Sequence, residues 1–258
     1  MFFGLFDKSP LLDETSEQWL FDAYAWALDN FDAGLFYSDS QLILPSNEFF
    51  PGRADSVDEM ANLMLERVKH YAGVGHWPTY VVDYNLAGDI DDPNVQIKGD
   101  LRGPGGIAYD SPTVSECLPI RYNPQQLSNP EGMIAGFAHT LAHYLGQLAK
   151  SEPPGGEENW PHVTELLAIF LGFGVMVANS AYTFKGGCGS CYNPAAVRDS
   201  FLSEVEATYA LAIFATLKGI PPGDVTRHLK KHLRGFYGKA VKSIQRHPTS
   251  MERLQQWA

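Results

Sequence analysis

Two histidines, His139 and His143, stand four residues apart in the run IAGFAHTLAHYLGQL at residues 134–148. This run is apolar and rich in alanine, which predicts a helix. A spacing of four residues brings both imidazoles onto one face of a helix, one turn apart. Two histidines in this geometry can hold one metal ion, so the pair is a candidate metal site.

The residue directly after the first histidine decides what chemistry such a site can perform. In the His-Glu-x-x-His motif of zinc hydrolases, glutamate at that position is the general base that acts on water. Here the motif reads HTLAH, with Thr140 at the position of the base. Three interpretations follow from the residues alone: a metallohydrolase, a metal site without hydrolysis, or a helix that only resembles one.

A third metal ligand is available in the next predicted helix. Glu165 follows His143 by 22 residues, in WPHVTELLA. A carboxylate on a following antiparallel helix can complete a site of two histidines and one glutamate. The alternative role of Glu165 is that of a first-turn carboxylate favoured by the helix dipole. The apolar neighbours of the two histidines predict a largely buried helix, and buried histidines need a partner, of which a metal is one.

The pattern AHTLAHYLG followed by VTELLAIFLGFGVMVANS resembles the zincins whose third ligand is glutamate or aspartate. It is more closely similar to a group of bacterial proteins of uncharacterised function with a zincin-like core. Three other segments look like that group: residues 44–51 (LPSNEFFP), residues 64–68 (MLERV), and residues 202–204 (LSE) followed by YALA at 209–212. The resemblance covers about residues 42–235.

The resemblance implies a role for each residue of the candidate site. His139 and His143 match the metal histidines, and Glu165 matches the third ligand, with glutamate in place of aspartate. Thr140 matches the catalytic glutamate and departs from it. This departure affects the expectation of hydrolysis more than the expectation of the fold.

Composition limits the function classes. The chain has 258 residues, 45% of them hydrophobic, which suits a single domain with one sizeable core. A formal net charge of −11 disfavours nucleic-acid binding. The start, MFFGLFDKSP, lacks the basic region of a secretory signal, and the longest apolar run, residues 166–178, is too short to span a membrane. Three cysteines do not suggest a disulfide framework. These features favour a cytoplasmic protein.

The predicted elements describe an α+β fold: a single, mostly helical zincin-like domain, residues 1–258, with a small N-terminal sheet. Residues 1–12 form an N-terminal arm and residues 239–258 a C-terminal helical tail. Strands are expected at residues 41–44, 79–84, 95–98, 106–109 and 117–122. Helices are expected at residues 15–31, 56–71, 161–181 and 223–236, and from residue 203 onward; residues 129–131 open the helix that carries the histidines. Thr15 with Gln18, Ser56 with Glu59 and Ser203 with Glu206 are the expected capping residues. Gly172 and Gly174 are expected to allow close packing against the histidine helix.

Two other groups of metal-ligand residues are weaker candidates. Cys188 and Cys191 form a C-x-x-C motif in a glycine-rich loop, and the second half of a zinc ribbon is absent. A redox pair, a local disulfide, a second metal site and plain loop cysteines all stay open. His228 and His232 are also four residues apart, but their basic surroundings and the lack of an adjacent acidic ligand predict a solvent-facing pair.

We therefore expect a zincin-like metal-binding protein with a degenerate metallopeptidase site, in which hydrolysis is weak or lost. The metal ligands are His139, His143 and Glu165, and Zn²⁺ suits them, although manganese, iron or nickel would also fit. One alternative is an active metallohydrolase that uses another carboxylate, such as Glu48, Glu131, Glu157 or Glu158. A second alternative is a structural or interaction protein without metal. The expected ligand is a small molecule or a peptide, and no nucleic acid.

Overall fold

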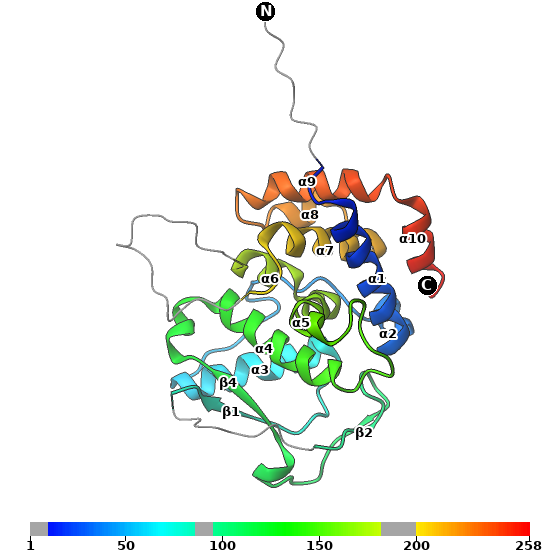
Figure 1. Ribbon diagram of the computed structural model, residues 1–258. Coiled ribbons are helices and arrows are strands. Elements are labelled where there is room, and N and C mark those ends of the chain that lie inside the picture. The colour runs from blue at the N-terminus through cyan, green and yellow to red at the C-terminus, as the bar shows by residue number, and fades with distance from the viewer. Residues whose placement is uncertain (1–9, 86–94, 182–199) are drawn as a thin grey trace, which may run out of the picture.

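The computed structural model describes residues 10–85, 95–181 and 200–258 (Figure 1). The helices are α1 (Glu14–Asn30), α2 (Ala33–Ser38), α3 (Val57–Ala72), α4 (Pro130–Gly146), α5 (Trp160–Ala168), α6 (Gly174–Ser180), α7 (Glu204–Leu217), α8 (Pro222–Thr226), α9 (Leu233–Ile244) and α10 (Pro248–Gln255). The strands are β1 (Thr79–Asp83), β2 (Lys98–Gly99), β3 (Gly106–Ile107) and β4 (Leu118–Tyr122). Among the described residues, the strands all lie between α3 and α4 in the chain.

The strands form two small sheets instead of the single one expected. β1 and β4 pair in parallel, with Thr79 opposite Leu118, whereas β2 and β3 form an antiparallel pair. The prediction of a mostly helical α+β fold with a small sheet is confirmed. The prediction of a strand at residues 41–44 is wrong. This segment is irregular, and its Ile43 donates a backbone hydrogen bond to the carbonyl oxygen of Gly172 at 3.0 Å instead of pairing with a strand.

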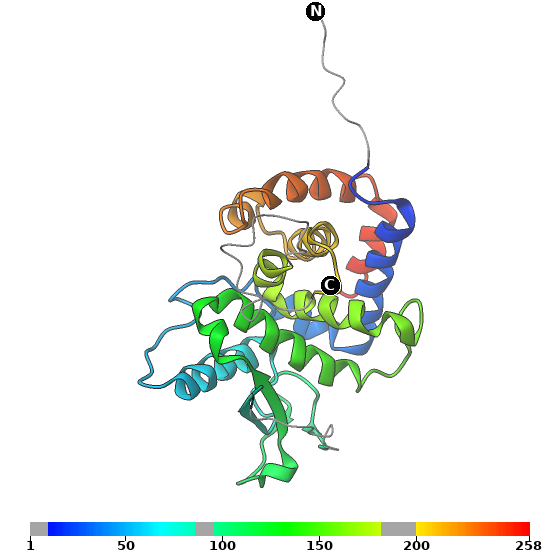
Figure 2. The same cartoon turned by 60° about the vertical axis from the view of Figure 1, so that its left-hand side comes forward.

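The helices α4, α5, α6 and α7 lie at the centre of one hydrophobic core, which nearly every described element contributes to. α4 packs between α3 and α5, and α7 packs between α6 and α9. Figures 1 and 2 show the same arrangement from two sides, with the β1–β4 pair at one end of the molecule and α9 along the opposite end. The C-terminal tail is helical as predicted, because α9 runs through Ile244 and α10 follows.

The helix predicted at residues 161–181 is interrupted at Gly172. Its backbone has φ of +103° within a π-helical turn, Ile169–Phe173, which separates α5 from α6. A Cβ atom at Gly172 would lie 2.2 Å from the carbonyl oxygen of Gln41. A Cβ atom at Gly174 would lie 2.8 Å from a methyl group of Leu211 in α7. The two glycines therefore allow close packing, as expected, but against the segment at Gln41 and against α7, and not against α4.

Side chains that accept hydrogen bonds from free backbone N–H groups mark several helix starts. Ser56 begins α3 and accepts a hydrogen bond from the backbone of Glu59, as predicted. Ser203 and Glu206 form the predicted capping box of α7. The prediction of Thr15 as the cap of the first helix is wrong, because Asp13 occupies that position.

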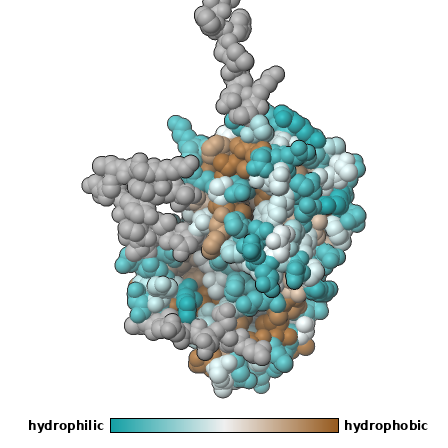
Figure 3. Space-filling view, viewed as in Figure 1, coloured by the Kyte–Doolittle hydropathy of each residue, from teal (hydrophilic) through white to brown (hydrophobic). Residues whose placement is uncertain are grey.

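One stretch of helix has the length and hydropathy of a membrane span. It covers residues 157–180, and its apolar window is entirely buried inside the protein, as in the core helix of a soluble protein. The face shown in Figure 3 is largely hydrophilic, with separate hydrophobic patches. Within residues 10–85, 95–181 and 200–258, the large hydrophobic side chains that are exposed are Val57, Tyr84, Ile107, Val114, Leu148 and Phe201.

Candidate functional site

Helix α4 presents the two histidines of the motif on one accessible stripe. The helix begins at Pro130, and the side chain of Asn129 accepts a hydrogen bond from the backbone of Gly132 at 3.2 Å. Most of the helix is buried, as the apolar pattern predicts. The residues of its second half that are not fully buried recur with helical spacing: Gly136, His139, Thr140, His143 and Gln147.

The two histidines differ in their surroundings. His139 is partly buried, and its ring lies parallel to the ring of Phe201, with 6.1 Å between the centroids. His143 is exposed, and its Nε2 lies 3.1 Å from Nε2 of Gln147, one turn further along the helix. The predicted common face is therefore present, with His139 at its inner end and His143 at its outer end.

Thr140 lies between them without the features of a base. Its hydroxyl group donates a hydrogen bond to the carbonyl oxygen of Gly136, one turn earlier, at 3.1 Å. This is the ordinary interaction of threonine inside a helix. A hydroxyl group in this role does not accept a proton at neutral pH, so nothing at position 140 replaces the missing glutamate.

Glu165 is fully buried in α5, with 0% of its surface exposed. Its Oε2 accepts hydrogen bonds from the backbone N–H groups of Phe201 at 2.8 Å and Leu202 at 2.6 Å. The hydroxyl group of Ser200 lies 3.3 Å from Oε1. These contacts join α5 to the segment that leads into α7. They therefore do not support the alternative role of Glu165 as a first-turn carboxylate.

Phe201 connects the candidate residues of three segments. One side of its ring faces His139, and its backbone N–H binds Glu165. The ring of His162, in α5, lies 6.2 Å away at an angle of 66°. Phe201 is nevertheless 45% exposed. Its position makes α4, α5 and the start of α7 meet at one point of the surface.

His162 is a residue of this region that the sequence reasoning did not select. Its Nδ1 atom is buried and has no hydrogen-bond partner within the described residues. Its ring also contacts the edge of Trp19, and it borders a small cavity of about 250 Å³ together with Thr15, Ser16 and Asn159. The available signal was its position three residues before Glu165, on the same side of the helix.

The donor types of the three predicted ligands fit zinc, because two imidazoles and a carboxylate are common zinc ligands. Their side-chain positions do not complete a site. Across residues 10–85, 95–181 and 200–258, no group of three or more His, Cys, Asp or Glu side chains is close enough to hold one ion. Glu165 directs its Oε2 at backbone N–H groups instead. Cys188 and Cys191 lie outside the described residues.

The carboxylates considered as replacement bases lie elsewhere or have other partners. Glu131 accepts a hydrogen bond from the side chain of Asn179 at 2.8 Å. Glu157 and Glu158 are exposed in a short 3₁₀ helix before α5, and Glu48 is exposed in the turn after residue 44. None of these contacts indicates that a carboxylate has taken over the function of position 140.

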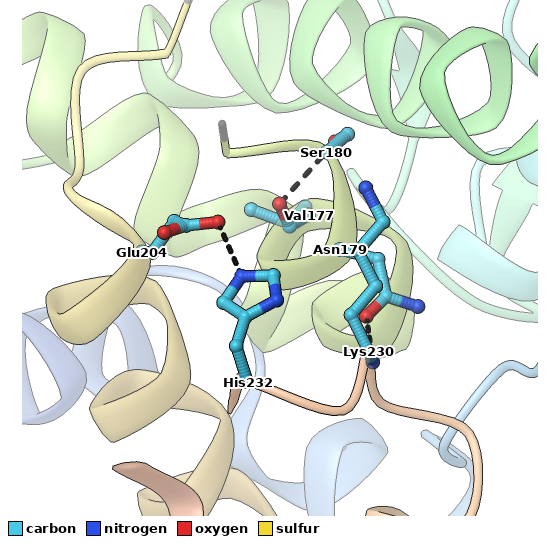
Figure 4. Close-up of polar contacts among 6 residues, drawn as sticks. All are labelled: Val177, Asn179, Ser180, Glu204, Lys230 and His232. Atoms are coloured by element: carbon cyan, nitrogen blue, oxygen red, sulfur yellow. Dashed lines mark hydrogen bonds and ion pairs between the residues drawn. The ribbon is translucent and has the colours of Figure 1, made fainter. Parts of the chain in front are cut away.

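The second histidine pair differs from the prediction. His228 and His232 do not share a helix, because α8 ends at Thr226 and α9 begins at Leu233. His232 also has an acidic partner: its Nε2 lies 2.8 Å from Oε1 of Glu204 (Figure 4). The predicted exposure to solvent holds for His232, whereas His228 is partly buried. The fold brings Glu204 next to His232 from 28 positions away in sequence.

Asn179 of α6 forms hydrogen bonds with the connection between α8 and α9. Asn179 accepts a hydrogen bond from the backbone of Lys230 at 2.9 Å (Figure 4). It also donates one to the carbonyl oxygen of His228 at 3.0 Å. Next to it, the hydroxyl group of Ser180 bonds back to the carbonyl oxygen of Val177 at 3.2 Å. These contacts give the second pair a structural setting and no metal-binding geometry.

Comparison of the chain with protein-family models, with curated proteins and with solved structures found no match.

Proposed function

We propose that the chain is a zincin-like metal-binding protein with a degenerate metallopeptidase site, in which hydrolysis is weak or lost. Its metal ligands are His139, His143 and Glu165, and the metal is zinc. The observation that carries the proposal is the link between Glu165 and His139: the residue whose backbone holds the buried carboxylate is also the residue whose ring covers the imidazole. That residue is Phe201.

The hydrogen bonds of Glu165 suit a metal-binding carboxylate. Carboxylates that bind metals are themselves commonly held by hydrogen bonds, which fix their orientation. Two backbone N–H groups hold Glu165 in this way, at a position with no exposure to solvent. The described residues form no three-ligand group, so a common ion requires the imidazoles of His139 and His143 to turn toward the anchored Glu165.

A bound zinc ion would supply Lewis-acid chemistry. Proton transfer would still lack its usual agent, since the hydroxyl group of Thr140 is bonded to Gly136 within its own helix. Loss of a general base typically lowers a rate by about 100- to 10,000-fold. This is why the proposal assigns the site to binding a small molecule or a peptide, in a soluble protein of the cytoplasm.

A second candidate function follows from the absence of a three-ligand group among the described residues. In that case the chain is a structural or interaction protein without metal. His139 then serves as a packing partner of Phe201, and Glu165 serves only to hold the start of the α7 segment.

Metal content measured by mass spectrometry separates the two candidates. The protein is purified without chelator or histidine tag, as wild type, His139→Ala and the control His70→Ala, which changes an exposed histidine of α3. We expect about one zinc ion per chain in the wild type and in the control, and none in His139→Ala. Absence of metal in the wild type, even after zinc is added back, would favour the second candidate.

The missing base is tested separately by Thr140→Glu. If the site is a degenerate peptidase, this change restores the motif and raises hydrolysis of a broad panel of peptide and amide substrates above the wild-type rate. Thr140→Gln is the matched control, because it has a similar size and no basic group. If the Thr140→Glu protein bound zinc but hydrolysed none of the substrates, the result would contradict the proposal that the site is a degenerate peptidase site.

A further inference from the structure

The segment at residues 227–246 is strongly basic in an acidic protein. It contains seven of the 19 Lys and Arg residues of the chain and no Asp or Glu. Without these seven cations the formal net charge of −11 would be −18. All seven side chains are exposed: Arg227, Lys230, Lys231, Arg234, Lys239, Lys242 and Arg246.

Helix α9 sorts this segment into two faces. Its buried residues, Leu233, Tyr237, Ala240 and Ile244, recur every three or four positions and pack toward α7. Three cations lie in α9: Lys239 and Lys242 are on the side opposite the buried residues, and Arg234 is at its edge, while the others flank the helix in sequence. They form a basic stripe, defined here as Arg227, Lys231, Arg234, Lys239, Lys242 and Arg246. Helix α9 as a whole is about 18 Å long, and its cations span about 12 Å of that length.

Most of the stripe is not neutralised by the protein itself. Arg227 forms an ion pair with Asp224. Arg234 is bonded to the carbonyl oxygens of Leu229 and Arg227. In the described part of the chain, no carboxylate lies within ion-pair distance of Lys231, Lys239, Lys242 or Arg246.

Two glycines interrupt the outer face of α9. Gly235 and Gly238 are exposed, and a Cβ atom at either would meet nothing within 4 Å. The packing of the protein therefore does not require glycine at these positions, although glycine lowers helix stability by about 1 kcal/mol relative to alanine. The lack of side chains leaves a flat area between the cations, where a partner can approach the helix backbone closely.

The place of α9 in the molecule indicates the shape of that partner. The helix runs along the end opposite the β1–β4 pair in both views (Figures 1 and 2). A flat surface can meet an exposed helix of this kind along its whole length. The carboxylates beside the helix, Asp224 and Glu204, pair with Arg227 and His232, so they are already occupied within the protein.

We propose that the basic stripe of α9 binds an anionic lipid surface. Each Lys or Arg close to such a surface is attracted to it, and the attraction falls within a Debye length of about 10 Å at 0.1 M salt. Carboxylates that lie farther than this from the stripe are screened. The net charge of −11 by itself predicts repulsion, which makes the proposal specific to the stripe.

Co-sedimentation of the full chain with vesicles tests the proposal. The vesicles contain phosphatidylcholine alone or phosphatidylcholine mixed with phosphatidylglycerol. The stripe variant carries Lys231→Gln, Lys239→Gln and Lys242→Gln. The control carries Arg53→Gln, Lys98→Gln and Lys150→Gln, which remove the same charge from exposed positions elsewhere. At low salt we expect the wild type and the control to bind only the anionic vesicles, and the stripe variant to bind them about 100-fold more weakly.

A second variant tests the flat area between the cations. Gly235→Glu has space for its side chain and adds one negative charge in the middle of the stripe. We expect it to fold as the wild type does and to lose vesicle binding. Equal binding by the wild type and the stripe variant, or no binding of the wild type to anionic vesicles, would overturn the proposal. So would tighter binding of the wild type to duplex DNA or to polyglutamate than to the vesicles.

Discussion

Replacing Gly172 by alanine tests whether the break between α5 and α6 is required by the packing of the segment before it. The backbone of Gly172 has φ of +103°, an angle that residues with a side chain rarely adopt. The left-handed region costs an ordinary residue about 1–2 kcal/mol. A Cβ atom would lie 2.2 Å from the carbonyl oxygen of Gln41, which is much closer than atoms in contact.

The overlap can be relieved only by moving backbone, because the nearest atom belongs to the main chain. Such a movement stretches the hydrogen bond from Ile43 to the carbonyl oxygen of Gly172, now 3.0 Å long and worth about 0.5–1.5 kcal/mol. It also disturbs the buried side chain of Ile43. The two quantified terms together predict that Gly172→Ala lowers the free energy of unfolding by about 1.5–3.5 kcal/mol.

Urea unfolding followed by circular dichroism measures this change. Gly136→Ala is the matched control, because Gly136 lies in α4 and a Cβ atom there meets nothing within 4 Å. That substitution is expected to raise the free energy of unfolding by about 0.5–1 kcal/mol, since alanine favours a helix over glycine. The reasoning would be refuted if Gly172→Ala lowered the free energy of unfolding by less than about 1 kcal/mol. It would also be refuted if both variants changed the free energy of unfolding in the same direction.

Two other predictions concern charged groups. Arg102 is 3% exposed and donates hydrogen bonds at 3.0 Å to the carbonyl oxygens of Ala72 and Phe31, at the C-terminal ends of α3 and α1. Arg102→Met should therefore lower the free energy of unfolding by about 3–5 kcal/mol in urea titrations, and a loss below about 1 kcal/mol would contradict this role. Asp13 caps α1, and the hydrogen bond from the backbone of Ser16 lowers the pKa of its carboxyl group from 3.8. The resulting stabilisation is complete above pH 3.8 and is lost as the pH falls through the lower pKa of the folded state. Asp13→Asn keeps the cap, so thermal unfolding should show the same stability near neutral pH and a smaller decrease in acid. An unchanged acid decrease would assign the effect to other carboxylates.

The sequence by itself determined the elements whose signals are local. Helical spacing of apolar residues identified α3, α4 and α7, and serine capping residues located the starts of α3 and α7. β-branched and aromatic residues identified β1, and residues 117–122 were a further strand candidate that corresponds to β4. The common face of His139 and His143 also followed from spacing alone, because a regular helix places residues four apart on one side.

Local signals were misleading where the backbone packs against a distant segment. Residues 41–44 have the composition of a strand, but the carbonyl oxygen of Gly172 takes the hydrogen bond that a neighbouring strand would offer. The periodic run at residues 223–236 breaks into two helices, with Asn179 bonded to the connection between them. No sequence pattern within either segment indicates which distant residue it contacts.

The tertiary structure alone decided how the candidate site is assembled. Glu165 is bonded to Phe201 and Leu202, and His139 stacks on Phe201, across separations of 36 and more positions in the chain. Such contacts depend on which helices pack together and at what angle, which the residues of one helix do not encode. The sequence can therefore state which side chains share a face of α4. What lies opposite that face depends on how α5 and the start of α7 pack against α4. A buried carboxylate such as Glu165 needs hydrogen-bond donors, and only the fold decides which residues supply them.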